Sequence, residues 1–176
     1  MLIENIKDVM ILISPLVLCF GASAICKMKK ESGSSVIFRP PGWTFGVVWT
    51  ILFIMLGFSF LICTKKSQNE KENGLRTETD VKELVKGNVL DILSYVIYGG
   101  IILCLASWIV TYGCLNNKLV SMWLYILIFM FVFMGLCVGN TISKILLCPL
   151  IAWLIFAIFM SAQELHNSSK HKTEQN

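Results

Sequence analysis

The chain has 176 residues, of which 56% are hydrophobic and 15% charged, with a formal net charge of +4 and a mean hydropathy of +0.72. A soluble domain needs more charge to cover its surface, so this composition excludes a soluble globular protein and indicates an integral membrane protein with the lipid bilayer as its partner. No soluble basic domain is evident, which argues against nucleic acid as a partner.

Five apolar runs are long enough to cross a bilayer, because about 20 mostly apolar residues span the hydrocarbon core as a helix. The runs are continuously apolar and do not alternate, which favours helices over the strands of a membrane barrel. The predicted fold class is therefore all-α, a bundle of five transmembrane helices in one membrane domain, residues 1–163. The predicted spans are about 9–26, 41–63, 90–113, 119–139 and 145–162.

The first run could instead be a cleaved signal peptide, because Ala22-Ser23-Ala24 resembles a cleavage site. The preceding residues, MLIENIKD, contain two acids and one lysine and lack the positively charged start of a signal peptide. The basic residues follow the run, within residues 27–30. We therefore expect a retained helix.

Two polar segments flank the later spans. Residues 64–88 are predicted to form a polar loop, either a solvated linker or a short interfacial helix that starts near Thr79. Residues 164–176 are predicted to be a polar, disordered tail. The two sides of the membrane hold eight and seven Lys/Arg residues, so the positive-inside rule does not determine the orientation.

The residue types that usually carry chemistry form no recognisable site. Seven cysteines are scattered through or beside the apolar runs without a CxxC pair, which predicts small hydrophobic residues and no disulfide framework or zinc site. The only histidines, His166 and His171, lie in the polar tail, so no metal site is expected. Asp91 and Glu164 are expected at the membrane interface. No Ser-His-Asp set, carboxylate pair or phosphate-binding glycine loop can be assembled, so neither catalytic residues nor a required cofactor are predicted.

Aromatic side chains lie beside small residues in the second, third and fifth spans. Pro40-Pro41 predicts the start of the second span, because proline suits the first turn of a helix, and Pro149 is expected to open the fifth in the same way. The small residues allow close helix packing and the adjacent aromatic groups suggest a ligand cavity. Belt positions at the headgroups are the alternative, and they suit Trp43 better than Trp108.

Two glycine pairs, Gly42/Gly46 and Gly135/Gly139, have the spacing that lets helix backbones approach closely. We expect them to pack within the bundle, and a homodimer is the alternative.

Three segments resemble the TspO/MBR family, the translocator proteins or peripheral-type benzodiazepine receptors. PPGWTFGVVWTILFIMLGF, residues 40–58, is similar to the family's second helix, which starts PPxWxFxPVW. CPLIAWLIFA, residues 148–157, resembles PYxAWxxFA in the fifth helix, and SWIVTYG, residues 107–113, resembles the WSPxFFG region of the third. The chain departs from the pattern at Ile101 and Leu105, where the family has Gln and Asn.

The resemblance implies a five-helix bundle that binds porphyrins or other tetrapyrroles, cholesterol or other sterols in a cavity between the helices, for transport or sensing. The missing polar residues imply a ligand specificity that differs from the family's. The residues expected to form the cavity wall are Trp43, Trp49, Phe53, Trp108, Trp153 and Ala157.

Two other functions remain open at this point. Some bacterial members of the family are linked to light-dependent porphyrin breakdown, which would make the chain an enzyme. A scaffold acting through residues 64–88 is the other. The resemblance implies the mitochondrial outer membrane for a eukaryotic or eukaryote-infecting source, and the bacterial envelope otherwise.

Overall fold

The computed structural model describes residues 5–26, 40–76, 81–115 and 117–174, with the backbone alone at residues 67, 69–76, 81–84, 86 and 168–174. This part of the chain contains five helices and no strand. Each helix holds a segment long and apolar enough to cross a membrane. The prediction of an all-α, five-span membrane protein is confirmed. The helices are α1 (Ile6–Ile25), α2 (Gly42–Arg76), α3 (Val81–Gly113), α4 (Lys118–Val138) and α5 (Thr141–Glu174).

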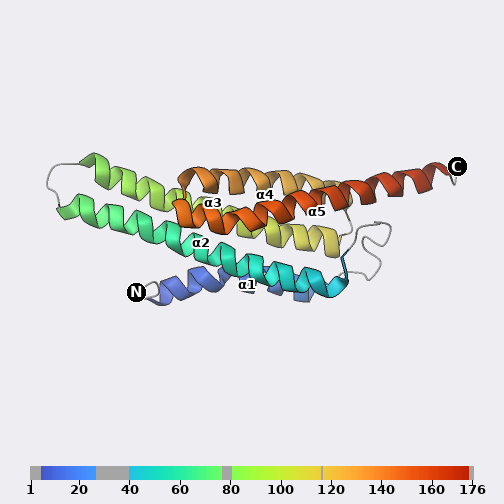
Figure 1. The fold of residues 1–176 in the computed structure, drawn as a ribbon, viewed down its shortest axis with the longest axis horizontal. Helices are drawn as coiled ribbons and strands as arrows, with labels where there is room; N and C mark the ends of the chain where they lie inside the picture. The colour runs from blue at the N-terminus through green and yellow to red at the C-terminus, as the bar shows by residue number, and fades with distance from the viewer. Residues whose placement is uncertain (1–4, 27–39, 77–80, 116, 175–176) are drawn as a thin grey trace.

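The helices lie side by side in an elongated bundle, with the two chain termini at opposite ends (Figure 1). The central helices are α2 and α3, which pack against each other and both contact α1. In addition, α2 packs against α5, α3 packs against α4, and α4 packs against α5. One end of the bundle therefore gathers the C-terminal ends of α1 and α3 with the N-terminal ends of α2 and α4 (Figure 1). We call this the α3-terminal end.

Two glycines allow neighbouring helices to approach closely. A Cβ atom at Gly57 of α2 would overlap the backbone carbonyl of Leu12 in α1. At Gly100 of α3, a Cβ atom would lie 2.8 Å from the Phe131 ring of α4. Such tight packing stabilises helix pairs in lipid, where burial of apolar surface gives little driving force.

The two GxxxG pairs differ in their surroundings. A Cβ atom at Gly135 would lie 3.2 Å from the Leu147 side chain, and one at Gly139 would lie 3.1 Å from the Ser143 hydroxyl, so this pair packs within the bundle. A Cβ atom at Gly42 or Gly46 of α2 would meet no heavy atom within 4 Å. The homodimer stays a prediction.

A buried polar cluster connects α2, α3 and α5. The Ser59 hydroxyl lies 2.8 Å from the Tyr98 hydroxyl and 2.7 Å from the Ser143 hydroxyl, and the latter two hydroxyls are 2.7 Å apart. All three residues are almost fully buried. Because each hydroxyl is satisfied by the other two helices, the cluster fixes the mutual rotation of α2, α3 and α5.

Several helices are longer than their predicted spans. α2 continues to Arg76 and α3 begins at Val81, so most of the predicted polar loop, residues 64–88, is helical. The predicted helix start at Thr79 lies outside the described residues. α5 continues to Glu174, through most of the segment that was predicted to be disordered. Lysine, glutamate and glutamine are good helix formers. Once a helix has formed within the membrane, each residue added to its end gains one hydrogen bond, so extending it costs less free energy than starting a new helix.

Proline has a different position in the second and fifth helices. Pro40-Pro41 directly precedes α2, as predicted, and the Pro41 carbonyl accepts a hydrogen bond of 3.0 Å from the Thr44 amide. The prediction that Pro149 opens the fifth helix is wrong, because α5 already begins at Thr141. A membrane helix tolerates an internal proline, since neighbouring groups and local adjustment satisfy the carbonyl that loses its donor.

Candidate functional site

Tryptophans from three helices meet inside the bundle. The Trp49 ring of α2 lies with its centroid 5.9 Å from that of Trp108 in α3 and 6.2 Å from that of Trp153 in α5. Phe53, one helical turn after Trp49, stacks on it at 5.3 Å. These separations are typical of favourable aromatic pairs. We call these four rings the tryptophan cluster.

Further rings extend the tryptophan cluster to all five helices. Trp108 is stacked on Tyr112 of the same helix at 5.3 Å and lies 5.2 Å from Tyr125 of α4. Phe20 of α1 meets Phe53 edge to face at 5.8 Å. Trp153 is flanked at 5.7 Å by Phe45 of α2 and at 5.3 Å by Phe156 of its own helix.

Two hydrogen-bond donors in the cluster are unused. The indole nitrogens Nε1 of Trp108 and Trp153 are buried and have no hydrogen-bond partner among the described residues. The Trp108 side chain as a whole is only 7% exposed. A buried polar group without a partner costs free energy, and Trp rarely leaves its N–H unpaired when buried. An acceptor atom on a bound molecule would remove this cost.

A polar group of three residues adjoins the tryptophan cluster at the α3-terminal end. The Tyr112 hydroxyl donates a hydrogen bond of 2.8 Å to Glu164 Oε2 of α5, and Lys118 Nζ of α4 lies 3.1 Å from Glu164 Oε1. Glu164 is only 5% exposed, so its carboxylate is buried between helices, and its location at the membrane interface stays a prediction. Paired ionisable residues within membrane spans commonly mark functional sites.

The structure brings together most of the predicted wall residues. Trp49, Phe53, Trp108 and Trp153 form the tryptophan cluster, and Ala157 is buried one turn after Trp153. Trp43 does not join them, since its side chain is 72% exposed.

The reason for the position of Trp43 is helical geometry. Six residues of an α-helix turn through about 600°, which places Trp43 about 120° away from Trp49 around the α2 axis. The family-like motif contains both residues but only one of them faces the bundle interior. Trp43 as a wall residue is not supported by this placement.

Sequence reasoning missed Tyr125, Lys118 and Glu164 as neighbours of the site. Glu164 offered a signal, because it is the single acid at the end of a long apolar run. Tyr125 offered a weaker one, as the only tyrosine in the fourth span. Neither signal identifies the partner helix.

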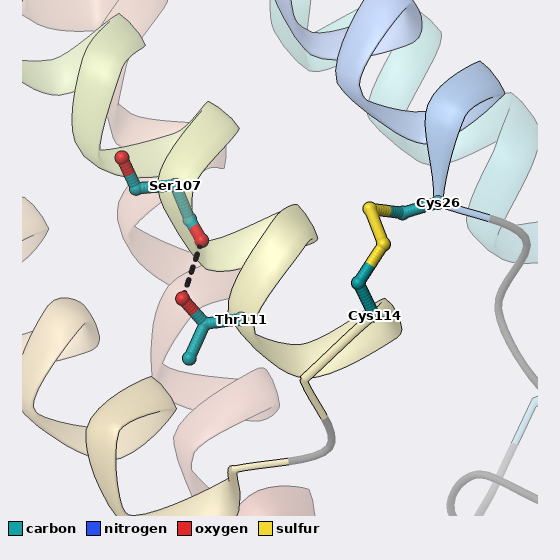
Figure 2. Close-up of a disulfide and its surroundings, with 4 residues drawn as sticks. All are labelled: Cys26, Ser107, Thr111 and Cys114. Atoms are coloured by element: carbon teal, nitrogen blue, oxygen red, sulfur yellow. Dashed lines mark hydrogen bonds between the residues drawn. A yellow bond between two sulfur atoms is a disulfide. The ribbon is translucent and has the colours of Figure 1, made fainter.

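A disulfide joins α1 to α3 at the α3-terminal end, beside the polar group of Tyr112, Lys118 and Glu164. Cys26 and Cys114 are bonded, with their Cα atoms 5.2 Å apart (Figure 2). One turn before Cys114, the Thr111 hydroxyl donates a 2.7 Å hydrogen bond to the Ser107 carbonyl within α3 (Figure 2). The prediction that all cysteines are unpaired hydrophobes is therefore wrong for two of the seven. The partners are 88 positions apart, and only folding brings them together.

The described residues contain no group of three or more His, Cys, Asp or Glu side chains placed to hold a metal ion. The arrangement instead offers aromatic faces, two indole N–H donors and one paired carboxylate. Such a set can hold a flat, largely apolar molecule by stacking and orient it through a few acceptor atoms.

Comparison with known proteins agrees with this architecture. The family model for the TspO/MBR family matches residues 12–165, from the first half of α1 to the membrane-spanning part of α5. No curated protein matches the chain. The match covers most of the sequence and all five membrane-spanning helices. The chain therefore belongs to the TspO/MBR family.

Proposed function

We propose that the protein binds a hydrophobic ligand, a porphyrin or other tetrapyrrole or a sterol, at the tryptophan cluster between α2, α3 and α5. The observation that supports this most directly is the contact of Trp49 with both Trp108 and Trp153, two residues whose indole N–H groups lack a partner. Transport or sensing of such a ligand is the proposed role.

The chemistry of the cluster favours a flat ligand with acceptor atoms. Aromatic rings interact with π systems by offset stacking or edge-to-face contacts, worth about 0.5–1.5 kcal/mol per pair beyond simple burial. A tetrapyrrole offers a large π face together with ring nitrogens and carboxylates that can accept hydrogen bonds. A sterol offers an apolar body and a single hydroxyl, and is the competing ligand class.

The polar groups near the proposed site lie at positions other than those where the family has Gln and Asn. Ile101 and Leu105, which stand where the family has Gln and Asn, are buried within the core and offer no hydrogen bond. The remaining donors near the site are the indole N–H groups, while Glu164 lies next to Tyr112 at its edge. This difference supports the proposal that ligand specificity departs from that of other family members.

A binding titration in the dark tests the proposal. Purified full-length protein in detergent is mixed with protoporphyrin, and the shift of the porphyrin absorbance band is followed so that tryptophan substitutions do not alter the signal. We expect a saturable shift that Trp49→Phe weakens about fivefold, which corresponds to about 1 kcal/mol of lost aromatic contact. Trp123→Phe is the matched control, because Trp123 is exposed on α4. A signal that does not saturate, or equal losses in both variants, contradicts the proposal.

The same samples separate the alternatives. A sterol that displaces the porphyrin identifies a shared site. If the porphyrin signal does not saturate and no sterol competes, the scaffold function is favoured over ligand binding. Illumination tests the enzyme alternative: loss of porphyrin absorbance that depends on Trp49 or Trp153 would favour light-dependent breakdown over binding alone.

Localisation in the mitochondrial outer membrane or bacterial envelope remains a proposal from the family resemblance.

A further inference from the structure

The Cys26–Cys114 disulfide lies at one end of the bundle. Cys26 directly follows α1 and Cys114 directly follows α3, so both sulfurs belong to the α3-terminal end (Figures 1 and 2). Helices that cross a membrane in alternating directions place these two ends on the same side. The bond therefore reports on the compartment that this side faces.

We infer that the α3-terminal end faces an oxidising compartment, and that the N-terminus and the α2–α3 connection face the cytosol. Disulfides persist in secretory lumens, in the periplasm and at cell surfaces, whereas cytosolic glutathione and thioredoxin keep thiols reduced. Formation of the bond removes two electrons and two protons from the Cys26 and Cys114 thiols. A disulfide-bonded exchange partner of the oxidising compartment accepts them and is reduced to a dithiol.

Five cysteines of the described structure are free thiols. Cys63 near the membrane end of α2, Cys137 at the end of α4 and Cys148 in the first turns of α5 all lie toward the opposite end of the bundle, and all are free thiols. Cys137 and Cys148 are exposed, yet they remain unpaired in the described structure. Cys19 and Cys104 are free as well and lie in the halves of α1 and α3 nearer the α3-terminal end, so the inferred orientation rests on the disulfide.

The disulfide supplies information that the charges do not. Eight Lys/Arg residues fall on one side of the membrane and seven on the other, so the positive-inside rule gives no orientation. The oxidation state of two residues decides between the two topologies instead.

The orientation has a consequence for the candidate site. Tyr112 lies two positions before Cys114, and Lys118 and Glu164 are bonded at the same end. The polar edge of the site is then reached from the oxidising side of the membrane. Of the two proposed locations, the inference therefore favours a bacterial envelope membrane, which borders a periplasm or the cell exterior, over a mitochondrial outer membrane with the reducing cytosol at the α3-terminal end.

Reporter fusions to the full-length chain test the orientation. Alkaline phosphatase requires export and disulfide formation for activity, and green fluorescent protein exported by the same unfolded route does not fluoresce. In a bacterial inner membrane we expect an active C-terminal phosphatase fusion, a dark C-terminal fluorescent fusion and a bright N-terminal one. A bright C-terminal fluorescent fusion with an inactive phosphatase fusion overturns the inference.

Thiol counting tests the bond in the same membranes. Free thiols are blocked with N-ethylmaleimide, the disulfide is reduced, and new thiols are labelled with a maleimide polymer that shifts gel mobility. The wild-type chain should gain two labels and the double variant Cys26→Ser, Cys114→Ser none. Cys137→Ser is the control and should gain two, because Cys137 is free. A wild-type chain that gains no label overturns the inference whatever the reporters show.

Discussion

Gly57 on α2 lies directly against the backbone carbonyl of Leu12 on α1, so closely that a Cβ atom at position 57 would overlap the Leu12 oxygen. A backbone oxygen within a helix cannot move aside as a flexible side chain can. The contact therefore ties α1 to the rest of the bundle at a position where only glycine fits.

The first prediction concerns this contact. Gly57→Ala should separate α1 from α2 and lower the free energy of unfolding by about 1–3 kcal/mol, the usual cost of overpacking. Thermal unfolding in detergent measures the effect. Gly99→Ala is the matched control, since a Cβ atom there meets nothing within 4 Å and alanine favours a helix over glycine. Equal stabilities of the two variants would show that α1 is not packed at Gly57.

The second prediction concerns the buried hydroxyls of Ser59, Tyr98 and Ser143. Tyr98→Phe should cost about 1 kcal/mol, because two buried hydroxyls lose a partner while the ring packing is kept. Thr50→Val is the comparison, because the Thr50 hydroxyl bonds only the Gly46 carbonyl of its own helix at 2.7 Å. A larger loss in Thr50→Val than in Tyr98→Phe would refute the role of the cluster in joining α2, α3 and α5.

The third prediction concerns the ion pair between half-buried Lys118 and buried Glu164. Lys118→Met removes the cation beside a carboxylate that still accepts the Tyr112 hydrogen bond, so it should destabilise by about 1–3 kcal/mol. The double variant Lys118→Met, Glu164→Gln should recover part of this loss, because no charge is then left unpaired. A double-mutant cycle of unfolding free energies gives the coupling, and additive losses would mean that the two residues act independently.

The fourth prediction concerns the unpaired indole N–H of Trp108. Replacement of Trp108 by benzothienylalanine keeps the ring size but exchanges the N–H for sulfur. Stability without ligand should hold or rise, since an unsatisfied buried donor is removed, while porphyrin affinity should fall about three- to tenfold through a lost hydrogen bond. The same replacement at exposed Trp123 is the control. Unchanged affinity at position 108 would exclude this N–H as a ligand contact.

The fifth prediction concerns the stabilising effect of the disulfide. Cys26→Ser should lower stability by about 2–4 kcal/mol under non-reducing conditions, because the bond closes a loop of 88 residues in the unfolded chain. A reductant should lower the wild-type unfolding temperature to that of the variant and leave the variant unchanged. Insensitivity of the wild-type protein to a reductant that demonstrably opens the bond would argue against this contribution.

The sequence by itself determined the number of membrane-spanning helices, their approximate positions and the family. Apolar runs of sufficient length have one stable outcome in lipid, where every backbone group must be hydrogen-bonded within its own helix. The motif around Trp49 and the segment around Trp153 likewise identified two of the rings that meet. These are properties of local sequence, and they needed no knowledge of which helices are neighbours.

The tertiary structure alone decided which side chains face the interior and which distant residues meet. Trp43 and Trp49 belong to one motif and lie about 120° apart around α2, and the rotation of α2 about its axis decides that Trp49 and not Trp43 faces the interior. Cys26 and Cys114 are 88 positions apart, and Glu164 finds its partners on two other helices. Periodicity fixes the relative angles of residues within a helix but leaves the rotation of that helix free. Close contacts between helices, such as that of Gly57 with Leu12, set this rotation.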